Sequence, residues 1–181
     1  MLKVGDRFEN PDTGASFEVL RAPAAGENVL DLRRVVKPRT GKTLPHVHLD
    51  YVEKFVVESG QARAKVDGRA VSLAPGDELE VPAGTAHTNP ANAGDDDLVM
   101  RHVFEPVSEF ILGYVETLGQ LMRQNRTNRQ GDLPVSVIFA LANQTDSQSF
   151  AAGLPKVLQR SVLAPIGAWY VGLRGYELRV P

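Results

Sequence analysis

The sequence predicts a mainly β domain, a sandwich or barrel, followed by an α-helical extension. As far as about Phe104, short apolar stretches alternate with segments rich in Gly, Pro, Asn and Asp, which is typical of short strands joined by turns. After Pro106, apolar residues recur at helical spacing instead. We therefore divide the chain into a β domain at residues 1–106 and a helical extension at residues 107–181, which packs on the barrel or on a dimer partner.

Seven stretches of the first part have the composition of strands. Between two of them, the Asp67–Gly68 pair favours a hairpin turn, because Gly tolerates a positive φ. The seven stretches are SFEVLRA (16–22), NVLDLRRVV (28–36), EKFVVES (53–59), QARAKV (61–66), AVSLA (70–74), DELEVP (77–82) and DLVMRHVF (97–104).

Three helices are predicted in the extension. Apolar residues at 110–122 recur at helical spacing and form one stripe, which indicates an amphipathic helix. Ser108 suits the N-cap of this helix, and Gly131 can stop it. Two more helical segments are expected at about 135–143 and 154–173.

The composition narrows the classes of function. The 181 residues carry a formal net charge of −2, with a pI of about 6.1, which argues against a general affinity for nucleic acid. Arg123, Arg126 and Arg129 gather near the expected end of the first helix, where the helix dipole explains them better than nucleic acid does. The chain has no cysteine, so disulfides and thiolate metal sites are excluded. Any metal must be bound by His, Asp or Glu.

Location and association are predicted from the two ends of the sequence. The N-terminal segment is charged and turn-rich, without the apolar region of a secretory signal, so we expect a cytoplasmic location. The uncharged stretch at 161–173 contains the single Trp, but it is too short to span a bilayer. It either lies on a membrane surface or, as we prefer, packs against the barrel or a second subunit. We therefore expect a homodimer.

Two of the four histidines, His46 and His48, lie close together, and Glu53 follows them. Side chains alternate along a strand, so the two histidines point the same way. Glu53 is an odd number of residues from His48, so on one straight strand its side chain would point to the opposite face. It can lie beside the two histidines only if the chain bends and a new strand begins near Glu53. Taken singly, each histidine is equally well a core residue, and the acid a surface residue.

A third histidine follows a tight corner further along the chain. In the stretch GDELEVPAGTAH (76–87), Pro82 presets φ and Gly84 supplies conformational freedom. His87 is therefore expected to begin a strand directly after the turn.

Together the two stretches resemble the two motifs of the cupin superfamily, in the same order. The first motif has His-x-His, then a Glu three or four residues later and a closing Gly six after that, and Glu53 and Gly60 match this spacing. The second motif, Gly, five residues, Pro-x-Gly, two residues and His, matches throughout 76–87. There are two departures, in residue types that are not metal ligands. Gly41 stands one residue closer to the first His than is usual, and the expected Asn is displaced, with Asn89 too early and Asn92 one residue late.

The resemblance implies a cupin-type β-jelly-roll barrel that binds one divalent transition metal per chain. The metal ligands it implies are His46, His48, Glu53 and His87. Three imidazoles and one carboxylate suit Fe, Mn, Ni, Cu or Zn and leave one or two positions open. The tail in turn resembles that of small bacterial cupins with added C-terminal helices, a group that implies no particular substrate.

Two more side chains are candidates for a catalytic role beside Glu53. If its strand face lines the interior, His102 either supports a metal ligand by a hydrogen bond or acts as a proton shuttle. If that face points out, it is an ordinary surface residue. Tyr51 lies between the ligands of the first motif and either reaches the rim of the pocket or serves in packing.

The function that these features favour is a mononuclear metal-dependent oxidoreductase, dioxygenase-like, acting on a small organic molecule. A non-catalytic barrel that binds or senses a small ligand is the alternative. Sugar isomerase or epimerase chemistry is a second alternative, which would need more polar residues in the lumen than the sequence offers.

Overall fold

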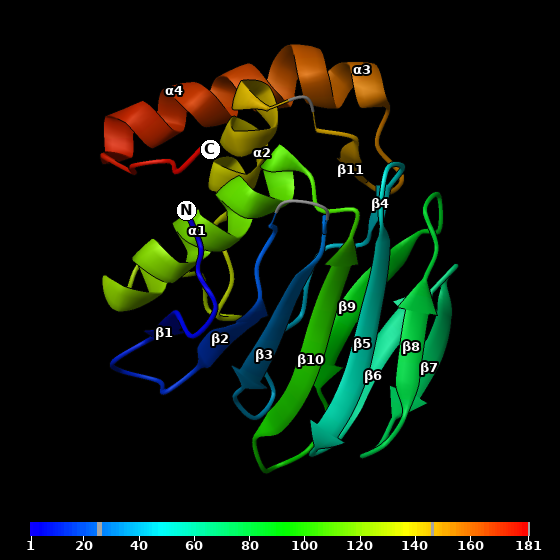
Figure 1. Cartoon of the computed structure of the whole chain (residues 1–181). Coiled ribbons are helices and arrows are strands. Elements are labelled where there is room, and N and C mark those ends of the chain that lie inside the picture. Colours follow the sequence, from blue (N-terminus) through cyan, green and yellow to red (C-terminus); the bar gives the residue numbers. More distant parts are fainter. Residues whose placement is uncertain (25–26, 146, 181) are drawn as a thin grey trace.

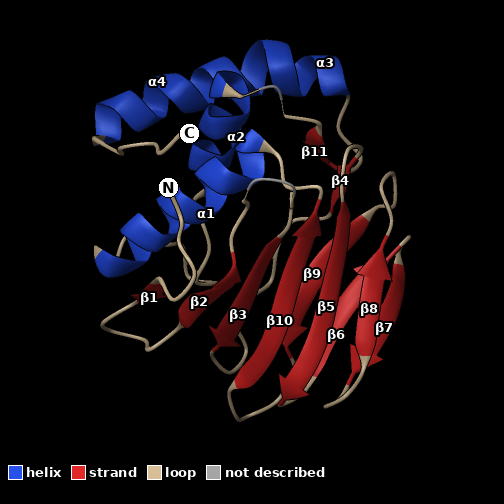
Figure 2. Cartoon of the chain, in the orientation of Figure 1, coloured by secondary structure: helices blue, strands red, loops and turns tan. Residues whose placement is uncertain are grey.

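Two antiparallel β-sheets form the body of the chain, and helices cover one end of them (Figures 1 and 2). The computed structural model describes residues 1–24, 27–145 and 147–180. The first sheet has the order β1-β2-β3-β10-β5-β8, with β1 Arg7–Glu9, β2 Ser16–Arg21, β3 Leu30–Val36, β10 Leu98–Glu105, β5 Val52–Ser59 and β8 Glu78–Val81. The second has the order β11-β4-β9-β6-β7, with β11 Ser149–Ala151, β4 His46–His48, β9 His87–Asn92, β6 Ala62–Val66 and β7 Arg69–Leu73.

All seven predicted strands are confirmed, and His87 begins β9 as expected. The mainly β fold with a helical C-terminal part is therefore confirmed as well. The hairpin between β6 and β7 turns at Asp67 and Gly68, whose φ angles of 47° and 78° are both positive, as a type I′ turn requires. β1 and β11 were not predicted from the sequence, because each has only three residues, too few to show a period.

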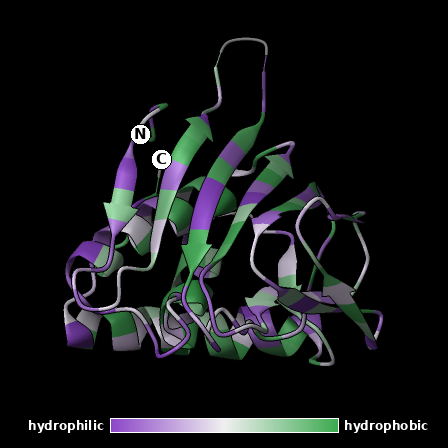
Figure 3. Cartoon of the chain, turned by 90° about the horizontal axis from the view of Figure 1, so that it is seen from below, coloured by the Kyte–Doolittle hydropathy of each residue, from purple (hydrophilic) through white to green (hydrophobic). Residues whose placement is uncertain are grey.

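Buried side chains alternate with more exposed ones along β5 and β10, so one face of each strand lies in the interior. Figure 3 shows hydrophobic and hydrophilic residues following one another along the strands. Along β5, Glu53, Phe55 and Val57 are buried and the residues between them are partly exposed. Between the sheets, at the end away from the helices, lies a small apolar core that consists of Val36, Phe55, Val57, Ala62, Leu73, Val81, Leu98 and Met100.

A second and larger core joins the helices to the first sheet. It packs Phe17 and Leu32 of that sheet against apolar side chains of the helices, including Leu118, Leu133 and Leu141. The helical part is thus bound to the β domain by the ordinary hydrophobic driving force.

The first helix, α1, spans Glu109–Arg123, and the Ser108 side chain accepts a hydrogen bond from the backbone N–H of Ile111 as the predicted N-cap. The prediction that this helix continues toward Gly131 is wrong. Asn125 has a φ of 52°, a left-handed conformation that Asn tolerates and that ends the helix earlier. Arg126, now beyond the helix, donates to the carbonyls of Arg174 and Gly175 at the end of the last helix.

The other two helices form where they were predicted. The second, α2, spans Val135–Gln144. The third is one helical run made of α3 (Lys156–Leu158), a π-helical turn η1 (Gln159–Leu163) and α4 (Ala164–Arg174). Within the described residues, none of these helices has the length and apolar character needed to cross a bilayer.

Candidate metal centre

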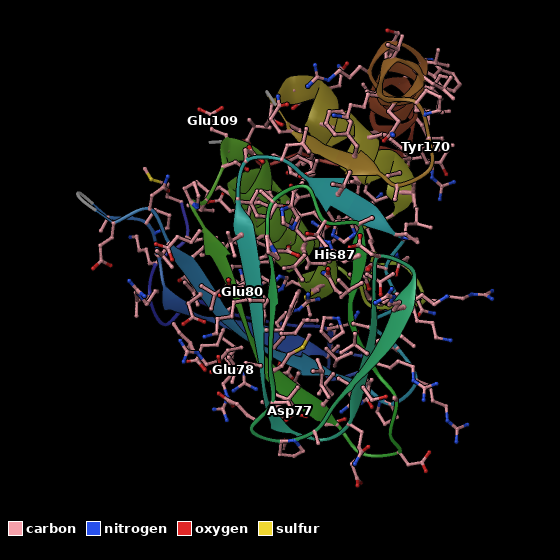
Figure 4. The ribbon with its side chains drawn as sticks, turned by 90° about the vertical axis from the view of Figure 1, so that its right-hand side faces the viewer. Asp77, Glu78, Glu80, His87, Glu109 and Tyr170 are labelled. Atoms are coloured by element: carbon pink, nitrogen blue, oxygen red, sulfur yellow. The ribbon has the colours of Figure 1, made fainter. Side chains whose placement is uncertain are left out.

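Three residues from different strands converge between the sheets. His46 of β4 pairs with His87 of β9 in one sheet, and Glu53 lies on β5 of the other. One ligand atom from each of the three lies within 4.8 Å of the others. In Figure 4 His87 lies in the interior, enclosed by the strands. The bend that Glu53 required is present, because β4 ends at His48 and β5 begins at Val52 in the opposite sheet.

Backbone carbonyls orient the imidazoles of His46 and His87. Nδ1 of His46 lies 2.9 Å from the carbonyl oxygen of Leu44, and Nδ1 of His87 lies 3.0 Å from that of Thr85. A carbonyl only accepts, so each Nδ1 carries the proton and donates it. In the neutral rings, the lone pair is therefore on Nε2. Burial lowers the pKa of His46, which keeps that ring neutral and able to bind a metal.

Glu53 lies at the centre of the cluster, and its side chain is only 3% exposed. Its Oε2 lies 2.8 Å from Nε2 of His87, and its Oε1 lies 3.2 Å from Nε2 of His102. Burial acts to raise the pKa of Glu53, but hydrogen bonds from the neighbouring histidines outweigh it and hold that pKa well below its usual value. A buried carboxylate facing the lone pair of His87 needs a cation between them, either a proton or a metal.

His48 is fully buried, and neither of its ring nitrogens has a hydrogen-bond partner among the described residues. Its Nε2 is 3.6 Å from Oε2 of Glu53, too far for a hydrogen bond. The ring itself is held by stacking on Tyr51, with centroids 4.0 Å apart. One nitrogen of this buried imidazole beside a carboxylate can bind a metal, so the donor set fits a divalent metal. Ligation by His48 stays a prediction.

His102 faces the interior, which decides between the two orientations that the sequence left open. Its ring lies between Phe55 and Phe104, with centroids 4.3 and 4.0 Å away. Nη1 of Arg34 is 3.5 Å from its Nδ1, and an arginine can only donate. The proton of the neutral ring is then on Nε2, which donates to Glu53. His102 therefore holds the Glu53 carboxylate in place by a hydrogen bond, as residues that support metal ligands do.

Tyr51 is buried, and its hydroxyl lies 3.2 Å from Oγ of Ser149 on β11. Burial, with a contribution from the charge of Glu53, raises the pKa of the Tyr51 hydroxyl well above its usual value. The hydroxyl is thus protonated near neutral pH. Tyr51 both packs against His48 and lines the cavity described next, so the structure combines the two roles that the sequence left open.

A cavity of about 430 Å³ opens beside the cluster, between the sheets and the helical part. Its volume falls in the range of small-molecule sites. His46, Glu53 and His102 lie on its wall. Most of the rest is apolar and comes from β10, α1, α2, β11 and the segments before β4 and α2, as follows: Leu44, Phe104, Phe110, Ile111, Leu133, Val135, Ile138, Phe139, Ala142, Phe150 and Ala151. The helical part therefore builds much of the cavity wall.

Sequence reasoning missed several polar residues of the site. Asn89 lines the cavity, and the alternation rule could have found it, because it shares a strand face with His87. Arg34 and Ser149 carried no local signal, since only the packing of distant strands brings them close. Asn92, by contrast, bonds the Val36 and Asp96 carbonyls through its side chain and so stabilises a loop away from the cavity.

A second buried pair lies on the helical side of the cavity. Tyr114 of α1 donates a hydrogen bond to Oδ1 of Asp132, and both residues line the wall. Burial and the neighbouring carboxylate raise the pKa of Tyr114 well above its usual value. This pair also lay outside the sequence predictions, because neither residue belongs to a motif.

Comparison with known proteins agrees with this geometry. The profile of the cupin domain family matches residues 32–104, which include all four predicted ligands. Residues 32–104 form a cupin domain. No curated protein matches the chain.

Solved structures of cupin-type fold are similar to about half of the chain. KdgF from Halomonas sp. is 18% identical, with a TM-score of 0.46, and the match covers 55% of this chain and 86% of that one. A Cupin 2 conserved barrel domain protein from Salinispora arenicola is 23% identical, with a TM-score of 0.43, over 54% and 79%. The plu4264 protein from Photorhabdus luminescens is 21% identical, with a TM-score of 0.44, over 61% and 89%.

Proposed function

We propose that this chain is a metal-dependent oxidoreductase of the dioxygenase type, acting on a small, partly apolar organic molecule. The supporting observation is the position of the His46, Glu53 and His87 cluster on the wall of a mainly apolar cavity of about 430 Å³. His46, His48, Glu53 and His87 would bind one divalent metal. When bound, the metal would supply a Lewis-acidic centre and, if it is Fe, Mn, Ni or Cu, a redox-active one. In a dioxygenase reaction both atoms of O₂ enter the substrate, so no external reductant is needed.

The residues around the cluster have distinct roles in this proposal. His102 holds Oε1 of Glu53 by donating from Nε2, which leaves Oε2 directed toward His87. The apolar side chains of α1 and α2 exclude water and bind the body of the substrate. Tyr51 keeps its proton and is a hydrogen-bond donor at the cavity wall. The apolar wall is also the reason to rank a sugar isomerase below the dioxygenase, since a sugar would leave many hydroxyls unpaired there.

The proposal is tested by oxygen uptake. Protein reconstituted separately with Fe(II), Mn(II), Ni(II), Cu(II) and Zn(II) is incubated with a panel of small phenols, diketones and thiols. We expect substrate-dependent uptake with at least one redox-active metal, and incorporation of both atoms of ¹⁸O₂ into the product. Zn(II)-loaded protein should be inactive. Stoichiometric metal without turnover of any candidate would instead favour the non-catalytic binding barrel.

We further propose that two copies of the chain pair through the last helix. Val162, Ile166, Trp169 and Leu173 follow one another at spacings of four, three and four residues, the pattern of a helix–helix seam, and they are 42%, 56%, 69% and 68% exposed. Such an exposed stripe on a helix indicates a contact surface. Neighbouring Tyr170 is at the margin of the molecule in Figure 4. The predicted cytoplasmic location likewise stays a proposal.

The pairing is tested with Trp169→Glu. We expect the wild type to sediment as a dimer and the variant as a monomer with an unchanged circular dichroism spectrum, because a charge in an apolar seam is costly. A monomeric wild type that instead binds anionic lipid vesicles would contradict pairing and support the membrane-surface interpretation.

A further inference from the structure

The strand that carries two of the predicted ligands has little attachment to the sheet on one side. β4 consists of His46, Val47 and His48, and toward β9 it pairs at a single position, His46 with His87. One more backbone bond on that side joins the N–H of Gly84 to the carbonyl of His48. The position of β4 must therefore depend on what lies along its other edge.

That other edge is covered by β11. The two strands pair along the whole of β4, with Ser149 opposite His48. Their pairing extends beyond both ends of β4, because the N–H of Ala152 bonds the carbonyl of Pro45 at 2.8 Å and the N–H of Leu49 bonds that of Gln148 at 3.2 Å. In Figure 1, β11 lies next to β4 and below α3. Most of the strand pairing of β4 thus comes from β11.

β11 also supports the ring of His48 through a side chain. Oγ of Ser149 lies 3.2 Å from the hydroxyl oxygen of Tyr51. The Tyr51 ring in turn stacks on the His48 ring, with centroids 4.0 Å apart. A shift of β11 would therefore disturb both the backbone of β4 and one of its two imidazoles.

The outer edge of β11 is held by one buried side chain from the helical part. Gln159 is 4% exposed and begins the π-helical turn η1, a kind of turn that is frequent at functional sites. Its Oε1 accepts a hydrogen bond from the N–H of Ala151 at 2.8 Å, and its Nε2 donates to the carbonyls of Ala151 and Leu154 at 3.0 and 2.9 Å. The amide thus occupies the edge along which a further strand would otherwise pair.

Two cationic side chains of the same helical run add weaker contacts to this segment. Nζ of Lys156 and Cζ of Arg160 are 4.8 and 5.1 Å from the centre of the Phe150 ring. Nη2 of Arg160 also donates to the carbonyl of Ser147 at 3.3 Å. Both cations are exposed, so these contacts contribute less than the buried hydrogen bonds of Gln159.

We infer that Gln159 is a positioning residue of the metal centre. It holds β11 against β4, and β11 in turn fixes where His46 and His48 present their rings. The inference rests on the metal centre of the proposed function, and it gives the helical part a role in metal binding besides lining the cavity. Ligands bind a metal well when the residues around them lock their geometry, so loss of this support should weaken binding.

The first test is hydrogen exchange of metal-free protein, followed by NMR. Gln159→Met preserves the length of the side chain but removes all three of its hydrogen bonds. We expect the N–H groups of Leu49 and Ala152, which bond across the two strands, to exchange at least about tenfold faster in the variant. Unchanged exchange would show that Gln159 does not hold β11 and would overturn the inference.

The second test is the binding of Co(II), measured by titration and by its absorption spectrum. We expect Gln159→Met to bind Co(II) at least about tenfold more weakly, as loss of a residue that supports metal ligands does. The spectrum of bound Co(II) should change as well, because it reports the arrangement of the ligands. Wild-type affinity and spectrum in the variant would overturn the inference. If Gln159→Met does not fold, Arg160→Met is measured instead, since it removes a surface contact to the same segment.

Thr117→Val is the matched control. Thr117 of α1 is fully buried, and its Oγ1 accepts a hydrogen bond from the N–H of Arg179 at 3.0 Å. The variant removes this bond from the helical part and leaves every bond of Gln159 in place. It should be less stable, yet it should exchange at Leu49 and Ala152 and bind Co(II) like the wild type.

An equal loss of Co(II) affinity in the control would mean that general destabilisation is the cause, and it would contradict the inference. A wild type that binds no Co(II) would overturn the proposed centre together with the inference. Absent oxygen uptake alone would affect only the proposed reaction, because neither test depends on turnover.

Discussion

The Glu53→Gln variant is expected to bind divalent metal at least about 100-fold more weakly than the wild type. Losing a residue that only hydrogen-bonds to a metal ligand lowers metal affinity by roughly 10–100-fold, and losing a ligand should cost more. The substitution preserves the shape of the side chain, but it replaces one accepting oxygen with a donating NH₂ group and removes the charge at the centre of the cluster. The remaining histidines would then have to bind a doubly charged ion without an anion beside it. Elemental analysis after dialysis, and isothermal titration with Zn(II) and Mn(II), measure the effect.

Glu58→Gln is the matched control, on the same strand. Glu58 is partly exposed, and its Oε2 pairs with Nε of Arg33 at 2.7 Å on the outer face of the sheet. Surface ion pairs contribute at most about 1 kcal/mol, so this variant should fold and bind metal like the wild type. Full metal binding by Glu53→Gln would disprove the assignment of Glu53 as a ligand. A wild type that binds no metal would rule out the centre altogether.

Gly167→Ala is expected to destabilise the protein by about 1–3 kcal/mol, as overpacking of a tight contact does. Gly167 lies where α4 crosses α2, and an added Cβ would be 2.7 Å from the carbonyl oxygen of Ser136 and 3.0 Å from Cβ of Phe139. The helix must move away to accept it. Because Phe139 and Ile138 line the cavity, the cavity wall should be displaced as well. Urea unfolding measures the loss of stability.

Gly172→Ala, five residues further along the same helix, should have the opposite effect. An added Cβ there meets no atom within 4 Å, and the residue is not in a left-handed conformation. Ala in an open helical position is more favourable than Gly by up to about 1 kcal/mol, so this variant should be as stable as the wild type or slightly more stable. If both glycine variants were equally stable, close packing of α4 on α2 would not be what positions the cavity wall.

Local patterns were sufficient to predict most of the strands and where the candidate ligands lie on them. The alternation rule placed His46 and His48 on one face and required a bend before Glu53, and the structure has that bend between β4 and β5. The turn residues Pro82 and Gly84 indicated that His87 begins a strand, which it does. These features depend on the order of neighbouring residues, which a sequence contains directly.

The end of the first helix was mispredicted because its signal was ambiguous. Arg126 and Gly131 suit a helix end by composition, yet Asn125 adopts a left-handed conformation and ends the helix first. Arg126 then lies over the ring of Tyr176, 4.1 Å from its centre, and bonds the end of α4. That long-range contact outweighs the weak local preference for continuing the helix.

The sequence by itself determined that the first part of the chain contains a cupin domain, with a set of His and Glu residues suited to one metal, and that a helical part follows it. The tertiary structure alone decided that His102 points inward to hold Glu53, that β11 pairs with β4, and that α1 and α2 complete the cavity. The physical reason is that periodicity specifies which face of an element is apolar. Which faces then meet depends on how strands and helices far apart in the chain bury their apolar surfaces together.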